Sequence, residues 1–328
     1  MPSAKTIDLK HLRYFIGIVD SKSLTRAAGL LHIAQPALSN RIAMLEEHLG
    51  VRLLIRSPTG VLPTREGEIL YAGAKRILRE LEIVIDQVCA KDDSPTGSVR
   101  FGCTGSSAYV ITQPMIKEVL KQFPDIHFSF SEGSSIDIYR RLLSDDADIA
   151  FIFTDGAVPG VRSKPLVKES LFVAVPVSDR RFATGNEFYA RDMAELDFVL
   201  ATNRPYFGTA YVHRRFEEAS IRLNVIAELD ALDGLIQMVI AGKAATIVPW
   251  SVGHAMEESG KLRLIAVRDI DLSRTLSLCH RSDQPLTPAV NAISDLTCKL
   301  IEKLILGGHW RHAQVLTQHA ADGASKLA

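Results

Sequence analysis

The stretch from Ser23 to Gly50 constrains the fold of this chain more than any other segment. Its sequence, SLTRAAGLLHIAQPALSNRIAMLEEHLG, predicts two short helices joined by a tight turn. If residues 34–49 form the second helix, its apolar residues share one side: Ala34, Ala37, Leu38, Ile42, Leu45 and Leu49. The opposite side carries Gln35, Ser39, Ala43 and Glu46, with Pro36, Asn40 and Glu47 beside them. Its first turns are therefore uncharged and polar, which suits a helix that lies in a DNA major groove.

An ordinary amphipathic helix pair has the same pattern. The flanking segments help to distinguish it from a DNA-binding helix-turn-helix. Residues 8–20 form a third amphipathic segment, and residues 51–64 hold two short apolar runs around the turn Ser57-Pro58-Thr59-Gly60. Three helices and a hairpin make a winged helix-turn-helix. Residues 1–65 contain nine lysines and arginines against four acidic residues, a net charge of +5 in a chain whose overall charge is zero. This basic module is the electrostatic footprint expected for a phosphate backbone.

Several motifs in this region resemble the N-terminal domain of the LysR-type transcriptional regulators. They are Ser-x-Thr-x-Ala-Ala (23–28), Ala-Gln-Pro-Ala-Leu-Ser (34–39), Leu-Glu-x-x-Leu-Gly (45–50), Leu-x-x-Arg (53–56) and Pro-Thr-x-x-Gly (63–67). The wording around Ile33–Ser39 and Leu53–Arg56 also resembles the branch that contains nitrogen assimilation control regulators. The resemblance implies a winged helix-turn-helix over residues 1–65 that reads an inverted repeat in double-stranded DNA.

The resemblance also assigns DNA-contacting positions on the helix pair and the wing: Ser23, Thr25, Gln35, Pro36, Ser39, Asn40 and Arg56. Two positions depart from the family pattern. Asn40 stands where many members have Arg or Gln, and Thr59 stands where many have an Arg near the wing tip. A second role for Arg56 stays open, namely an ion pair beneath the wing, because phosphate-positioning and folding roles look alike in a sequence.

Residues 64–92 have the pattern of a linker helix that pairs two chains. Thr64 is placed to cap the helix, and apolar residues then recur at alternating spacings of four and three: Leu70, Ala74, Ile77, Leu81, Val84 and Val88. So narrow a seam among charged residues favours a partner helix over packing within one domain. The family dimerises through such a helix, and we expect a homodimer or homotetramer.

Beyond the turn-rich segment 91–98, strand-like and helical runs alternate through residues 98–308. This α/β body resembles the effector-binding domain of the same family, which has two lobes and a periplasmic-binding-protein fold. The resemblance places a small-molecule effector between the lobes, and the chain is expected to cross near Pro165–Lys168 and return near Val267–Ile270. Residues 309–328, rich in Ala, Gln, Ser and His, are expected to form a flexible tail.

Two turns rich in glycine and serine are the first candidates for the effector site. Each follows a predicted strand, at Thr104–Ser107 and at Gly133–Ser135, and precedes a helix. Ligands bind open α/β sheets at the carboxyl ends of strands, and helix N-termini favour an anion such as a carboxylate. The candidates are Thr104, Ser106, Ser107, Ser134 and Ser135, with Thr202 in a third loop that also holds Arg204. These hydroxyls could instead serve only as helix caps.

Other classes of function lack their signatures. The four cysteines form no Cys-x-x-Cys pair and are expected to be reduced core residues; a redox pair is the alternative. His309 and His312 alone are weak evidence for a metal, and no P-loop, nucleophile elbow or dinucleotide fingerprint occurs. No signal peptide or apolar run of membrane-spanning length is present. We therefore expect no cofactor, no membrane partner and a cytoplasmic protein.

The sequence thus predicts a ligand-responsive transcription regulator, not an enzyme, that acts at promoters with RNA polymerase. The alternative is an enzyme or a transport-type binding protein fused to a winged helix. It would need a convergent acid–base or metal constellation, or a signal peptide, and the sequence offers neither. The effector's identity, the target genes and the direction of regulation are not encoded in any motif.

Overall fold

The computed structural model describes residues 7–58, 60–89, 95–154, 156–182, 188–201 and 209–316. It divides into two compact units, Met1–Ala90 and Lys91–Ala328. Thr59, Thr202, Arg204 and residues 317–328, on which some of the predictions fall, lie outside the described residues. Over the described part, no helix is both long and apolar enough to cross a membrane.

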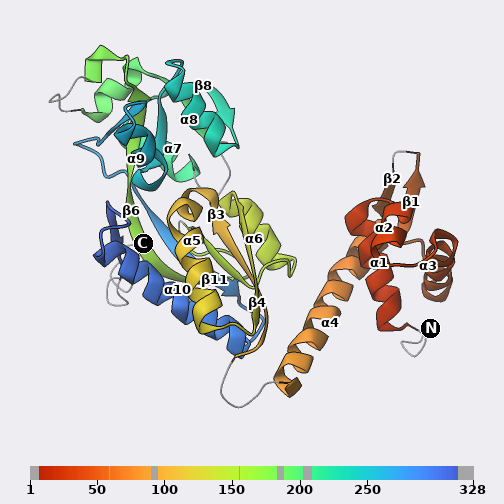
Figure 1. The fold of residues 1–328 in the computed structure, drawn as a ribbon. Coiled ribbons are helices and arrows are strands. Elements are labelled where there is room, and N and C mark those ends of the chain that lie inside the picture. Colours follow the sequence, from red (N-terminus) through yellow and green to blue (C-terminus); the bar gives the residue numbers. More distant parts are fainter. Residues whose placement is uncertain are drawn as a thin grey trace. The chain divides into compact units, whose positions relative to one another are not determined.

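The first unit is the predicted winged helix-turn-helix followed by a long helix (Figure 1). Its elements are α1 (Leu9–Ser21), α2 (Leu24–Leu30), α3 (Gln35–Leu49), β1 (Leu54–Ser57), β2 (Gly60–Pro63) and α4 (Arg65–Cys89). The wing strands β1 and β2 pair antiparallel. The core of the unit is built from Phe15, Ile18, Leu38, Ile42, Leu45 and Leu53, each at most 2% exposed. Leu38, Ile42 and Leu45 bury the predicted apolar side of α3, whereas Ala34 and Ala37 at its start are exposed.

The motif residues of this unit have local structural causes. The Ser23 hydroxyl accepts the Arg26 N–H at 3.3 Å and caps α2. Gly50 ends α3 with φ 70°, a left-handed conformation that glycine adopts readily. Thr64 caps the start of α4 by accepting the Gly67 N–H at 3.0 Å, as predicted, and a Cβ on Gly67 would lie 2.1 Å from the Leu53 carbonyl oxygen. The Pro-Thr-x-x-Gly motif therefore closes the wing onto α4.

Glu46 corrects the sequence prediction, which placed it on the polar side of α3. Its side chain is buried, at 6% exposed, and it accepts the backbone N–H groups of Leu53 and Leu54 at 2.8 and 3.1 Å. Arg52 adds an ion pair at 3.2 Å. Glu46 therefore ties the end of the recognition helix to the first residues of the wing, a role that helix periodicity does not predict.

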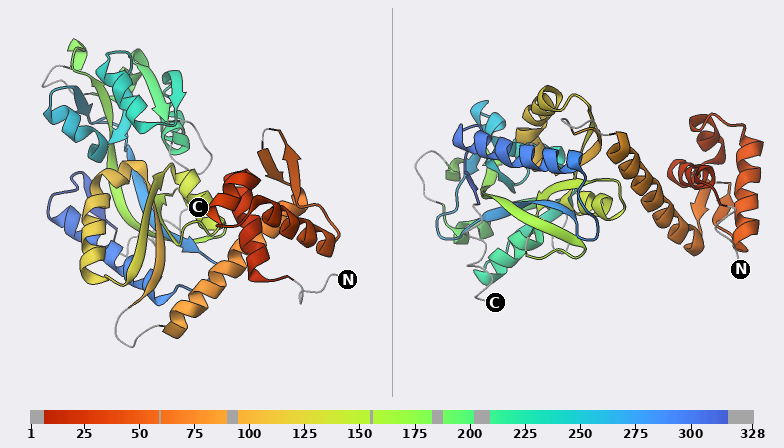
Figure 2. Two further views of the ribbon diagram at one scale, coloured as in Figure 1. Left: turned by 45° about the vertical axis from the view of Figure 1, so that its right-hand side comes forward. Right: turned by 90° about the horizontal axis from the view of Figure 1, so that it is seen from below.

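The second unit has the predicted α/β architecture in two lobes (Figures 1 and 2). The first lobe contains β3 (Gly97–Thr104), α5 (Gly105–Gln122), β4 (Ile126–Gly133), α6 (Ser135–Leu143), β5 (Ile149–Phe153), β11 (Ser273–Arg281) and α10 (Pro288–Leu306). The second lobe contains β7 (Asp197–Ala201), α7 (Thr209–Glu218), β8 (Asn224–Leu229), α8 (Leu232–Ile240), β9 (Thr246–Pro249), α9 (Trp250–Glu258) and β10 (Leu262–Ile265). Two short 3₁₀ helices span Arg180–Phe182 and Ala190–Glu195.

One strand, β6 (Val161–Pro176), runs through both lobes. Up to Ser170 it pairs with β11, and from Leu171 onward it pairs with β9 and β10. The strand order is β10-β6-β11-β5-β3-β4. The chain therefore passes between lobes near Ser170 and returns near Leu272, a few residues beyond the predicted crossings. The first half of this strand was not predicted because it contains Pro165, and proline is unusual inside a strand. A register shift in β11 opposite Pro165, between Leu276 and Ser277, accommodates the proline.

One further boundary differs from the predictions, and one helix was missed. The turn predicted at Thr104–Ser107 is shorter than expected, because α5 already begins at Gly105 and continues through Pro114. The turn between β3 and α5 is therefore minimal, so that Ser106 and Ser107 lie in the first turn of the helix. Helix α9 was not predicted at all.

The predicted flexible tail is wrong for residues 309–316. Trp310 is 1% exposed and packs edge-on against Phe151, with ring centroids 6.3 Å apart. Strand β12 (Ala313–Val315) then pairs with β6. A large apolar ring and an added strand bury more surface than the polar composition of this segment suggested.

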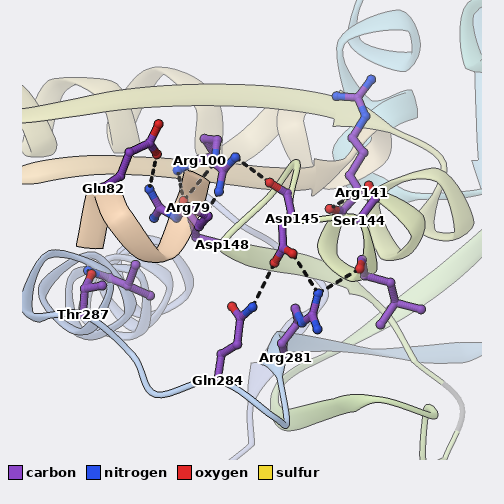
Figure 3. A network of polar contacts seen from close by, with 12 residues as sticks. Arg79, Glu82, Arg100, Arg141, Ser144, Asp145, Asp148, Arg281, Gln284 and Thr287 are labelled. Atoms are coloured by element: carbon purple, nitrogen blue, oxygen red, sulfur yellow. Dashed lines mark hydrogen bonds and ion pairs between the residues drawn. The ribbon is translucent and has the colours of Figure 1, made fainter. Parts of the chain in front are cut away.

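A partly buried polar network holds together the part of the first lobe where β3, β5 and β11 meet the loop after α6 (Figure 3). Arg281 and Gln284 contact the side chain of Asp145, each at 3.1 Å. Arg100 pairs with Asp148 at 2.9 Å and also donates to the Asp145 carbonyl oxygen. Each charge here has a partner within the lobe, so the network is structural.

Candidate functional site

The polar face of α3 is open to a partner. Gln35, Pro36 and Asn40 are exposed, Ser39 is half-buried, and Thr25 on the preceding helix is exposed. Within the described residues no hydrogen bond holds the side-chain amide of Gln35 or Asn40. Their amides therefore keep donors and acceptors available for base edges, where an amide can bond adenine in two places.

Arg56 joins the wing to this face. It extends from β1 and donates from Nη1 to the Ser39 hydroxyl oxygen at 3.0 Å. Among the described residues it forms no ion pair with an acid, so the alternative of an ion pair beneath the wing, which the sequence left open, is not found. The guanidinium stays exposed. A positive charge fixed beside the start of α3 can both orient Ser39 and meet a phosphate.

The predicted seam on α4 divides into two parts. Leu70 packs against the core of its own unit, and Ala74 is fully buried. Farther along, Ile77, Val84 and Val88 are 51%, 45% and 80% exposed, and Leu81 between them is partly buried. Apolar side chains at these spacings form an exposed stripe on a long helix, which is typical of a helix that pairs with another chain.

A cleft of about 400 Å³ lies between the two lobes of the second unit. The first lobe contributes both predicted turns to its lining, through Thr104–Ser106 and Gly133–Ser135, together with Glu132, Ile136 and Asp137. The second lobe contributes a mainly apolar wall: Leu171, Leu200, Ala201, Tyr211, Val212, Asp230, Leu232, Leu235, Ile247, Val248 and Pro249. The structure thus brings the two Gly/Ser turns into one site, where the helices α5 and α6 begin.

Arg274, at the start of β11, lies on the lining of this cleft where the chain crosses between lobes. Its Nε donates to Glu169 at 2.6 Å, and its Nη2 donates to the Ser106 hydroxyl at 2.6 Å. Glu169 is 2% exposed and also accepts the indole N–H of Trp310 at 3.1 Å. The guanidinium is thus oriented toward the cleft by a buried carboxylate that balances its charge.

The other predicted hydroxyls have different surroundings. Thr104 is the N-cap residue of α5, yet its hydroxyl makes no capping bond. Ser134 caps α6 by accepting the Asp137 N–H at 3.2 Å, and Ser135 accepts the Phe153 N–H at 3.2 Å. Ser107 is fully buried, does not line the cleft, and its hydroxyl has no partner among the described residues. The cap alternative therefore applies to Ser134, whereas Thr104 is free to bond a ligand.

Sequence reasoning missed the charged residues of the cleft. Arg274 and Glu169 sit in strands whose mixed polar and apolar pattern reads as a solvent-exposed edge, and they face each other only because β6 and β11 pair. Glu132 directly precedes the predicted turn Gly133–Ser135 and was not among the candidates. No local motif marks any of the three.

Helices α5 and α8 meet through a hydrogen bond between the lobes. The Tyr109 hydroxyl donates to Asp233 at 2.9 Å. Burial, this bond to Asp233 and the charges of Asp233 and Glu132 raise the pKa of Tyr109 to about 12. The phenol therefore stays protonated and keeps donating at any physiological pH. The described residues contain no cluster of three His, Cys, Asp or Glu that could hold a metal ion.

Comparison with known families agrees with this geometry. Residues 9–68 match the family described as bacterial regulatory helix-turn-helix protein, lysR family, and residues 92–297 match the LysR substrate binding domain. The chain is 31% identical over 301 residues to the nitrogen assimilation regulatory protein nac of Klebsiella aerogenes, covering 90% of this chain and 96% of that protein. It is also 31% identical over 303 residues to nac of Escherichia coli, covering 92% and 97%.

Solved structures show the same fold. The structure of full-length CbnR complexed with its target DNA matches with a TM-score of 0.68 at 21% identity, covering 90% of this chain and all of that one. A full-length OxyR variant from Pseudomonas aeruginosa matches with a TM-score of 0.66 at 20% identity, covering 90% and 94%.

Proposed function

Because this chain belongs to the LysR family of DNA-binding transcriptional regulators, we propose that it reads an inverted repeat through α3 and the wing, and that a small molecule in the interlobe cleft changes this binding. The observation that carries the proposal is the open polar face of α3. In this account Gln35, Ser39 and Asn40 read base edges, while Arg56 positions the head on the backbone. Ser23 and Thr25, at the start of α2, lie against phosphates.

The exposed stripe on α4 supports pairing of two chains. An inverted repeat has the two-fold symmetry of a dimer, so a chain that binds such a repeat needs a dimer contact, which the stripe can supply. We assign the pairing to Ile77, Leu81, Val84 and Val88, with Leu70 and Ala74 anchoring the helix to its own head. A tetramer would need a second interface on the effector unit.

The cleft supports the sensing half of the proposal. It is concave, largely apolar on one side and polar on the other, which is typical of small-molecule sites. Thr104, Ser106 and Arg274 would hold an anionic group such as a carboxylate, with Ser134, Ser135 and Thr202 at its edge. The similarity to nac proteins places the chain near the nitrogen assimilation branch. We further propose that the protein acts in the cytoplasm, at promoters bound by RNA polymerase.

Selection of DNA from a random pool tests the reading of an inverted repeat. The full chain should enrich an inverted repeat whose half-sites are spaced by whole helical turns. Enrichment of a single half-site, or of no sequence, would contradict the proposal.

Leu81→Asp tests the pairing through α4. A charge placed in the middle of the stripe should abolish the dimer and reduce the selected site to weak binding, because an unpaired charge is costly in an apolar interface. Sedimentation measures the oligomer, and Glu80→Gln on the same helix serves as the control. An unchanged oligomer in Leu81→Asp would show that the chains pair elsewhere.

A further inference from the structure

The carboxylates around the cleft differ in whether the protein already satisfies them. Glu169 is paired with Arg274 and Trp310, Asp233 accepts from Tyr109, and the Asp137 carboxylate accepts from the Ser134 hydroxyl. Glu132 lines the cleft, yet no hydrogen bond or ion pair to it is found among the described residues. Among the described residues, no cation lies within ion-pair distance of this carboxylate.

The position of Glu132 is fixed by the parallel pairing of β3 and β4. Glu132 lies opposite Cys103, and the next pair is Thr104 opposite Gly133. The carboxylate therefore stands directly beside the turn from which α5 begins. Its charge is felt there, since burial and then Glu132 raise the pKa of the Cys103 thiol well above its ordinary value.

Positive potential lies next to this carboxylate. The N–H groups at the start of α5 and the guanidinium of Arg274 favour an anionic group near Thr104 and Ser106. A ligand that is only an anion would satisfy this group but would also be repelled by Glu132. A ligand that carries a cation close to its anion would satisfy both.

The remaining wall of the cleft is mainly apolar, with Asp230 and Tyr211 as its polar members. Leu200, Val212, Leu235 and Val248 from the second lobe are each at most 6% exposed and face the charged turns of the first lobe. The cleft thus offers three neighbouring surfaces. One is a carboxylate that can bind a cation, one is a set of hydrogen-bond donors that can bind an anion, and one is an apolar wall.

Resting on the proposal that the cleft binds the effector, we propose that this effector is an amino acid or a close analogue with an apolar side chain. Its ammonium group is held by Glu132, its carboxylate by the start of α5 with Arg274, and its side chain by the wall of the second lobe.

The experiment uses five apolar amino acids: valine, leucine, isoleucine, methionine and phenylalanine. Each is compared with its N-acetyl derivative and with the corresponding acid that lacks the amine. Thermal shifts of the full chain report binding, and footprints on the selected DNA site report response. At least one amino acid should raise Tm and alter the footprint, while its two amine-free counterparts should bind at least tenfold more weakly.

Glu132→Gln should lower the affinity for that amino acid about tenfold or more and bring it close to the affinity for the amine-free acid. Glu302→Gln, an exposed residue of α10 in the same lobe, should bind like the parent. If the amine-free acids bind and alter the footprint as well as the amino acid does, or if Glu132→Gln binds like the parent, this inference fails while the effector cleft stands. If none of the compounds binds, this inference fails, and the effector of the proposed function belongs to another chemical class.

Discussion

The recognition face of the first unit and the cleft of the second differ in how far each side chain serves its own fold. Gln35 and Asn40 on α3 are exposed and are not held by side-chain hydrogen bonds among the described residues. In the cleft, Arg274 and Glu169 connect β11, β6, α5 and the segment after α10 before any ligand is present. The DNA-contacting face of α3 can keep its side-chain donors and acceptors unpaired within its own fold. A cleft between two lobes instead needs protein partners that hold its charged groups in place.

A third set of charges sharpens the contrast. The network around Asp145 is partly buried and also pairs arginines with carboxylates, but its members satisfy one another inside one lobe (Figure 3). The pair of Arg274 and Glu169 differs because it lies at the crossing between lobes and borders an open cleft. We therefore expect changes at Arg274 and Glu169 to affect both stability and ligand response, and changes at Asp145 to affect stability alone.

Glu169→Ala should have the largest effect on stability. It leaves the guanidinium of Arg274 and the indole N–H of Trp310 without their acceptor, and breaking a buried pair in this way costs about 3–5 kcal/mol. Both tryptophans, Trp250 and Trp310, lie in the second unit, so urea unfolding followed by tryptophan fluorescence reports that unit alone. Glu169→Gln should lose less, because its amide oxygen can still accept. A loss under about 1 kcal/mol in Glu169→Ala would place the pair outside the framework of the fold.

Thr104→Val should come next and should act on the ligand rather than on the fold. The hydroxyl makes no capping bond, so its removal leaves α5 intact. A lost hydrogen bond to a charged ligand group would weaken effector response by roughly 1.5–3 kcal/mol. Effector response is measured by titrating the effector against a transcriptional reporter, in Thr104→Val and in Ser106→Ala, Ser107→Ala and Ser134→Ala.

In that series, Ser107→Ala should respond like the parent because Ser107 does not line the cleft, and Ser134→Ala should lose about 1 kcal/mol of stability as a helix cap. Parental response in Thr104→Val and Ser106→Ala together would move the ligand to another site.

Arg56→Ala should have the smallest effect. Its exposed bond to Ser39 contributes roughly 0.5–1.5 kcal/mol to the fold at most. If the guanidinium meets a phosphate, affinity for selected and random DNA should fall alike, and the salt dependence should lose about one ion. Loss confined to the selected sequence would instead make Arg56 a base reader.

The helix periods and turn signals predicted the elements of the first unit and the α/β alternation of the second, because amphipathic patterns such as Leu38, Ile42 and Leu45 depend on local spacing. The same reasoning brought Thr104 and Ser134 to one edge of a sheet, which follows from the parallel order of strands. It failed where long-range pairing decides. Glu46 is buried because the wing folds back onto it, and Glu169 faces Arg274 because two strands far apart in the sequence pair.

The tail was mispredicted for a related reason. Composition alone describes Arg311 and the residues after it as polar, but the place of Trp310 is set by Phe151 and Glu169, which lie far away in the chain. Sequence reasoning therefore recovers exposed faces and turn chemistry, and it misses charged residues whose partners come from another strand.

The account assigns base reading to the unpaired polar face of α3 and ligand sensing to the cleft of the second unit. The most direct test of this division is the affinity of Gln35→Ala for two DNAs, the selected inverted repeat and a random sequence of equal length. His48→Ala, exposed at the other end of α3, is the control. We expect Gln35→Ala to lose roughly 1–3 kcal/mol on the selected site and almost nothing on random DNA, because an amide that reads bases does not contribute to backbone binding. The tryptophan-reported unfolding curve and the ligand-induced thermal shift should stay unchanged. Equal losses on both DNAs would contradict the assignment of α3 as the base-reading face.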